Sequence, residues 1–135
     1  LVFGESPVAE KLLELAPQFG WAVANVSVDA PLDARTPNRA RYLVIATQGQ
    51  DDLAALKTGL ADPTEYVAFV GSTKKFASLS KKLIAAGIDP SLIAAVRAPA
   101  GLNIGAVTPT EIALSILAEL TQVKRGLFVK VAQNG

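Results

Sequence analysis

The chain has 135 residues and a formal net charge of +1, which suits one domain with a buried core and gives no reason to expect nucleic-acid or membrane binding. Cysteine, histidine and methionine are all absent, which excludes disulfides, thiolate nucleophiles and the usual ligands of zinc or copper. Half of the residues are hydrophobic, but no apolar run could span a membrane and no signal peptide is visible, so we expect a soluble, cytoplasmic protein.

The first half of the chain alternates strand-like and helix-like patterns. Residues 1–3 read as the end of a strand, and the helix that follows has Ser6 as its cap and Pro7 in its first turn. Helical spacing of apolar residues continues this helix to Gly20. The elements expected next are a strand at residues 21–28, a loop at 30–41, a strand at 42–46, a turn at 47–50 and a helix that stops before residue 62.

The second half continues this alternation. A strand at residues 66–70 leads into a helix that starts after Gly71 and ends at Gly87. The sequence TPTE at residues 108–111 has the pattern of a capping box, so a long helix is expected from there to about residue 124. The shorter expected elements are a helical turn opened by Asp89, a strand at residues 95–97 and a last strand at 127–131.

Strands that alternate with helices indicate a mostly parallel sheet covered by helices, which is a three-layer, Rossmann-like α/β arrangement. We expect residues 1–135 to form one such domain. The chain has no initiator methionine and begins inside a strand pattern, so we also expect it to be the C-terminal part of a longer protein. Ligands of such sheets bind beyond the carboxyl ends of the strands.

The first candidate site at that edge is the opening strand-turn-helix. Gly4 and Ser6 stand where a phosphate cradle would lie, but Pro7 removes a backbone donor and Glu5 adds a negative charge. Two readings stay open, a modified phosphate cradle and an ordinary capped helix start. Asp29 and Thr47 follow the second and third strands, with Asp29 in the position of a ribose-binding acid.

The second candidate is the turn at residues 71–75. Gly71, Ser72, Lys74 and Lys75 combine a glycine, a hydroxyl and two cations at a helix start, which suits an anion. Lysines in a first turn oppose the helix dipole, and a bound anion would remove that conflict. The alternative is a solvated basic turn.

The third candidate is the glycine-containing loop at residues 99–106, which suits a ligand-facing loop or a subunit contact. It leads into the capped helix, where Glu111 is a better capping partner than catalytic base. Glu119 falls on an apolar face of that helix, and a buried acid needs a partner.

The stretches YVAFVGSTKK and VRAPAGLNIGAVTPTEIALSILAEL resemble the C-terminal Rossmann-like domain of the XdhC/CoxI family. The resemblance covers most of residues 42–126, and its motifs are a G-S-x-x-K turn and P-x-G-L-x-I-G-A-x-T-P-x-E-I-A-x-S-I-x-A-E. Members help to mature molybdenum hydroxylases such as xanthine dehydrogenase and carbon monoxide dehydrogenase. The resemblance implies an accessory protein, not an enzyme, that binds molybdenum cofactor (molybdopterin) and aids its insertion.

The partner that this resemblance implies is the apo form of a molybdenum hydroxylase, with a cysteine desulfurase and a second copy of the chain as further candidates. The residues expected to contact a cofactor are Gly4, Ser6, Asp29, Thr47, Gly71, Ser72, Lys74, Lys75, Pro99, Gly101, Leu102, Gly105, Thr108 and Glu111.

The chain departs from the family pattern at two turns. Many members carry G-A-G-H-V and T-H-x-H or T-R-G-H, where this chain has GESPV at residues 4–8 and TQGQ at 47–50. Without these histidines no metal site is expected. Two other functions stay open: an NAD(P)-dependent oxidoreductase or nucleotide-binding module, and a structural module for oligomerisation or docking. A large apolar patch without a ligand-sized cleft would favour the structural module.

Overall fold

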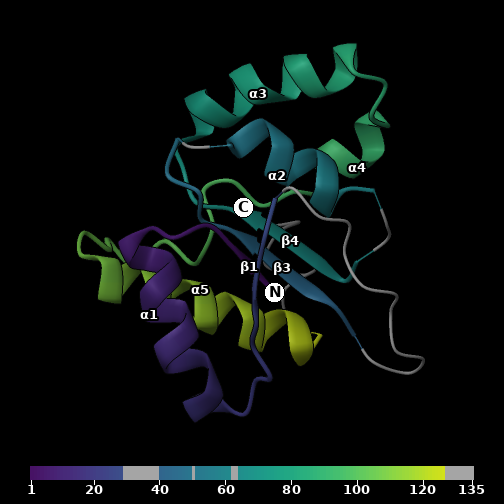
Figure 1. The fold of residues 1–135 in the computed structure, drawn as a ribbon. Helices are drawn as coiled ribbons and strands as arrows, with labels where there is room; N and C mark the ends of the chain where they lie inside the picture. Colours follow the sequence, from purple (N-terminus) through teal and green to yellow (C-terminus); the bar gives the residue numbers. More distant parts are fainter. Residues whose placement is uncertain (29–39, 50, 62–63, 127–135) are drawn as a thin grey trace.

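The computed structural model describes residues 1–28, 40–49, 51–61 and 64–126. Its centre is a parallel four-stranded sheet in the order β2-β1-β3-β4 (Figure 1). The strands are β1 (Val2–Phe3), β2 (Asn25–Val26), β3 (Tyr42–Ile45) and β4 (Tyr66–Phe69). The predicted Rossmann-like α/β fold is confirmed.

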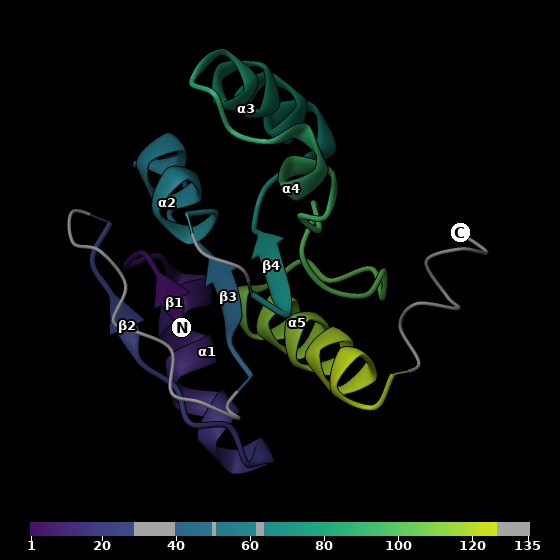
Figure 2. The same cartoon turned by 90° about the vertical axis from the view of Figure 1, so that its right-hand side faces the viewer.

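Helices cover both faces of this sheet and make the predicted three layers. In Figure 2, α1 and α5 lie below the strands, and α2, α3 and α4 lie above them. The helices are α1 (Pro7–Leu15), continued by the 3-10 turn η1 (Ala16–Phe19), α2 (Asp52–Gly59), α3 (Thr73–Ala85), α4 (Pro90–Ala94) and α5 (Pro109–Lys124). None of the helices in these described ranges is long and apolar enough to cross a membrane.

Strand alternation divides the core into two clusters. Successive side chains of a strand point to opposite faces, so Val44 packs with α1 and α5 while Leu43 and Ile45 pack with α2 and α3. In the same way, Tyr66 belongs to the first cluster and Phe69 to the second. Burial on both faces explains why the strands read as continuous apolar runs.

The helix starts follow the sequence pattern closely. Ser6 and Ser72 accept hydrogen bonds from the backbone N–H three residues later, and Thr108 and Glu111 form the complete capping box. Each of these caps joins residues at most three apart, so local sequence is enough to predict it.

Two predicted strands are shorter than expected. Residues 21–28 pair with the sheet only at Asn25–Val26, because their partner β1 offers only Val2 and Phe3 to the ladder. The strand expected at 95–97 is reduced to a single parallel bridge between Arg97 and Ala68. The strand expected at 127–131, and the loop expected at 30–41 except its last two residues, lie outside the described residues.

Candidate functional site

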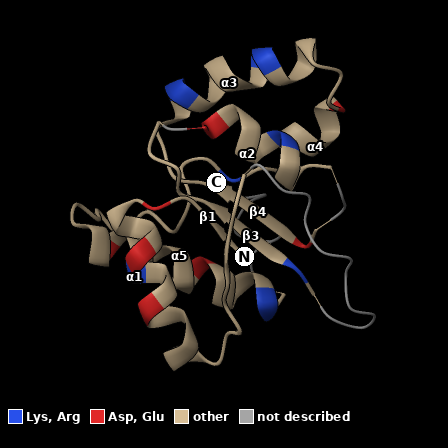
Figure 3. Cartoon of the chain, viewed as in Figure 1, with Lys and Arg blue, Asp and Glu red and all other residues tan. Residues whose placement is uncertain are grey.

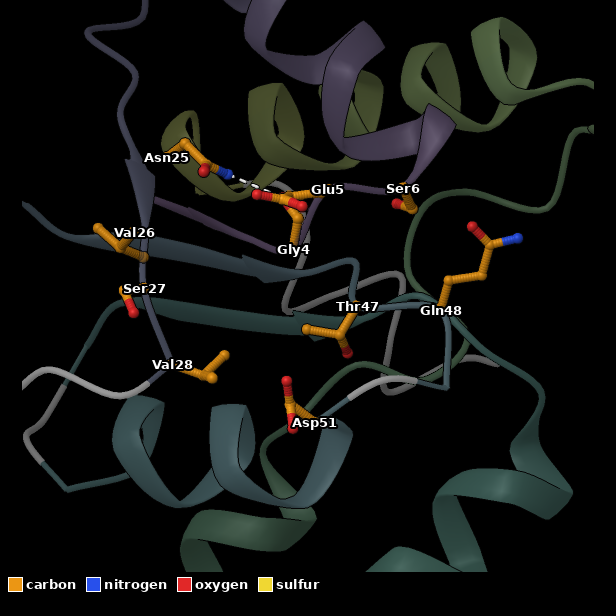
Figure 4. A pocket seen from close by; sticks show the side chains of 10 residues that line it. All are labelled: Gly4, Glu5, Ser6, Asn25, Val26, Ser27, Val28, Thr47, Gln48 and Asp51. Atoms are coloured by element: carbon orange, nitrogen blue, oxygen red, sulfur yellow. Dashed lines mark hydrogen bonds between the residues drawn. The ribbon is translucent and has the colours of Figure 1, made fainter.

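A cavity of about 840 Å³ lies beyond the carboxyl ends of β1, β2 and β3 (Figure 4). We call it the edge cavity. Its walls come from three segments that are distant in the sequence, and its described lining is Gly4, Glu5, Ser6, Asn25, Val26, Ser27, Val28, Thr47, Gln48 and Asp51.

The edge cavity lies where the direction of chain winding reverses. From β1 the chain passes through α1 to β2 on one side of the sheet, and from β3 it passes through α2 to β4 on the other. The two helices therefore leave neighbouring strands toward opposite faces and open a crevice between them. Such a switch point is the usual ligand position in doubly wound sheets.

Contacts within the chain close the first turn tightly. Gly4 has φ +105°, and a Cβ placed on it would lie 2.3 Å from the carbonyl oxygen of Ala46. The Ser6 hydroxyl donates to that same oxygen at 2.6 Å and accepts from the Ala9 N–H at 3.2 Å. Because Pro7 has no N–H, α1 keeps few free donors for a phosphate. The glycine here serves close packing between β1 and β3.

Asp52 organises the opposite wall. Its buried carboxylate accepts hydrogen bonds from the Thr47 hydroxyl and, at 3.2 Å, from the Gly49 N–H. Gln48 and Asp51 adopt the left-handed backbone conformation, with φ of 54° and 62°. This geometry is uncommon for residues other than glycine, and it is held here by the turn that Asp52 anchors.

The described lining carries two carboxylates, on Glu5 and Asp51, and no lysine or arginine. Over the rest of the fold the charges are mixed, and Figure 3 shows basic residues on α1 and α2 as well as on α3. Since carboxylates accept hydrogen bonds and repel anions, this lining suits a ligand group that donates hydrogen bonds and not a phosphate.

The comparisons with known proteins place the chain in a family. A family model described as the XdhC Rossmann domain matches residues 1–120. The chain belongs to the XdhC Rossmann domain family. The match includes both the resembling motifs and the first turn, where the sequence departs from the family pattern.

Two relatives of this XdhC domain illustrate its extent. The uncharacterized protein YqeB of Escherichia coli (strain K12) is 38% identical in an alignment of 119 residues, and the match covers 85% of this chain and 20% of YqeB. A crystal structure from Bacillus halodurans, described as that of a xanthine dehydrogenase, shares the fold with a TM-score of 0.64 at 24% identity, over 93% of this chain and 42% of that one. The XdhC domain therefore spans less than half of either relative.

The turn at residues 71–75, the second candidate site, is engaged by the protein's own side chains. Lys75 Nζ lies 3.0 Å from Asp52 Oδ2, so a buried carboxylate supplies the negative charge that we expected from a ligand. The ring of Phe69 lies against Gly71, where a Cβ would come within 2.4 Å of it. Lys74 is exposed. Anion binding at this turn stays a prediction.

The two lysines of this turn should differ in their effect on stability. Lys75→Met keeps the aliphatic stem but leaves the Asp52 carboxylate without its cation, so we expect a loss of about 1–2 kcal/mol of unfolding free energy in urea denaturation. Lys74→Met, its matched control, should stay within about 0.5 kcal/mol of the parent. Equal losses in the two variants would contradict the structural role of the Lys75–Asp52 pair.

The loop at residues 99–105 lies against α5 and away from the described lining. The buried carboxylate of Glu119 accepts from the Tyr66 hydroxyl at 2.5 Å and from the Gly101 N–H at 3.1 Å. Burial, and then the neighbouring Glu119 carboxylate, raise the pKa of Tyr66 far above its usual value, so this phenol remains a donor. Glu119 thus has the partner that the sequence required. In the same loop, Leu102, which follows Gly101, donates its N–H to the Ser115 carbonyl.

Glu111 acts as the capping partner of α5. It accepts from the Thr108 N–H at 3.0 Å and from the Val107 N–H at 2.9 Å, and these bonds lower the pKa of Glu111. Gly105 has φ +75° in open space, and Pro99 follows a cis peptide bond. The contacts of these residues are structural, and their role toward a cofactor stays a prediction.

The structure thus brings together Gly4, Ser6 and Thr47 from the predicted set, and places the other described members elsewhere. Asp29 lies outside the described residues. The lining residues that the predicted cofactor contacts did not include are Glu5, Asn25, Val26, Ser27, Val28, Gln48 and Asp51. For Glu5 and Gln48 the available signal was their place in the turns after β1 and β3, whereas Asn25 lies within β2 and Asp51 at the start of α2. No group of three or more potential metal ligands occurs among the described residues.

Proposed function

We propose that this XdhC domain is the cofactor-binding module of an accessory protein for molybdenum hydroxylases, and that it holds molybdopterin in the edge cavity before delivery to the apo-enzyme. The observation that carries the proposal is a cavity of about 840 Å³ at the switch point of a domain from this family. Ligand pockets for small molecules commonly have volumes of about 300–1,000 Å³. Once delivered, the cofactor supplies the molybdenum centre of the target enzyme.

The lining fits the pterin part of this cofactor. A pterin ring presents N–H and amino donors, which Glu5, Gln48 and Asp51 could accept through carboxylate and amide oxygens. The phosphate of the cofactor does not fit beside Glu5, because like charges repel there. Among the described residues, cations stand at the start of α3, where Lys75 already contacts Asp52, the residue after Asp51. We propose that the phosphate lies on that side.

A thermal-shift comparison tests this function. Isolated molybdopterin at about 100 times its dissociation constant should stabilise the folded chain by about 2.7 kcal/mol, which is on the order of 10 °C in melting temperature. NADH, NADPH and cytidine nucleotides serve as the competing ligands. A shift with NAD(P)H and none with molybdopterin would favour the oxidoreductase or nucleotide-binding alternative and reject the proposal.

A further inference from the structure

Two carboxylates of the edge cavity are uncommitted. Neither Glu5 nor Asp51 makes a hydrogen bond or ion pair with another residue in the described part of the chain. Asp51 stands at the cap position of α2, yet its side chain forms no cap hydrogen bond. In Figure 4 its carboxylate extends from the start of α2 toward Thr47, while Glu5 lies across the cavity beside Asn25. The adjacent Asp52, in contrast, is fully engaged in the wall.

Glu5 occupies the first turn, where a dinucleotide places its pyrophosphate in related folds. Three features of that turn disfavour an anion: the carboxylate itself, the missing N–H of Pro7, and the Ala9 N–H that Ser6 already binds. The Glu5 carboxylate is therefore an acceptor with two oxygens in the lining of a ligand-sized cavity. A carboxylate of this kind pairs best with two parallel N–H donors.

We propose that Glu5 receives the paired donors of a 2-amino-4-oxo ring, which are a ring N–H and the neighbouring amino group of a pterin or guanine, and that it excludes a pyrophosphate from the first turn. This proposal rests on the proposed cofactor-binding function and adds the orientation of the ligand: the donor edge of the ring lies at β1. Adenine lacks this pair of donors, and adenine dinucleotides also carry the pyrophosphate that the first turn excludes. Adenine nucleotides should therefore be poor ligands.

Fluorescence titration of the full chain tests this orientation with 6-hydroxymethylpterin, a pterin without phosphate. Glu5→Gln keeps the side-chain shape but replaces one acceptor by a donor, so affinity should fall by about tenfold or more. Glu10→Gln is the matched control, because Glu10 is an exposed acid in the first turn of α1 outside the described lining. It should change affinity by less than about twofold.

Competition with unlabelled compounds shows whether the site binds a pterin only or also the guanine ring. Guanosine should displace hydroxymethylpterin if Glu5 recognises only the paired donors of the ring. Adenosine and ADP-ribose should not displace it. Equal pterin affinity in the parent and Glu5→Gln, or tight ADP-ribose binding by the parent, would overturn the assignment of Glu5. If molybdopterin still raises the melting temperature in that case, the proposed function survives. If neither pterin compound binds the parent chain, both proposals fail.

A purely structural role of Glu5 has a different signature. A carboxylate just before a helix start stabilises the helix dipole, so Glu5→Gln would then lower the melting temperature and leave the pterin affinity per folded molecule unchanged. Circular dichroism of each variant at the titration temperature provides the folded fraction for this correction.

Discussion

Replacing Gly4 by alanine should lower the free energy of unfolding by about 4 kcal/mol. The new Cβ would lie 2.3 Å from the Ala46 carbonyl oxygen and 2.8 Å from the Thr47 Cα. These are backbone atoms just beyond the end of β3, the strand paired with β1, so no side-chain rotation can relieve the clash. The residue would also have to adopt a φ of +105°. Urea denaturation with comparison of midpoints and m-values measures the loss.

Gly20→Ala is the matched control for this substitution. Gly20 also has positive φ, at +85°, but a Cβ there meets nothing within 4 Å. Its substitution should cost only the backbone strain, about 1–2 kcal/mol. The difference in unfolding free energy between the two variants therefore measures the cost of the steric clash between the first turn and the end of β3. Similar losses at both glycines would show that the two strand ends can separate without much cost.

Replacing Glu119 by leucine should cost about 3 kcal/mol, because it leaves two buried donors without an acceptor: the Tyr66 hydroxyl and the Gly101 N–H. Leucine is of similar size, so the loss reports mainly on hydrogen bonding. The same carboxylate joins β4, α5 and the loop between α4 and α5, so the loop at residues 99–105 should also lose protection from hydrogen exchange.

A double-mutant cycle with Tyr66→Phe isolates the hydroxyl–carboxylate contact. In the double variant the orphaned hydroxyl is gone, so the combined loss should be smaller than the sum of the single losses by about 1–2 kcal/mol. Purely additive losses would mean that the 2.5 Å contact contributes nothing to stability.

The position of the edge cavity shows why site prediction was harder than fold prediction. The motifs that reveal the family stand mainly in the second half of the chain, where Gly101 packs against α5 and Gly71 against the ring of Phe69. The cavity depends on the first half, where the sequence departs from the family pattern. A residue such as Asp51 has no local signature, because its place beside the ends of β1 and β2 follows from strand order.

Sequence by itself determined the fold class, the alternation of strands and helices, and the caps at Ser6, Ser72 and Thr108. These features depend on side-chain periodicity and on hydrogen bonds between residues at most three apart, so they are encoded locally. Only the tertiary structure decided that Asp52 neutralises Lys75 and that Glu119 joins Tyr66 to Gly101. It also decided where the cavity opens. Each of these arrangements joins segments that meet only when the strands pair in one register, and neither composition nor spacing specifies that pairing.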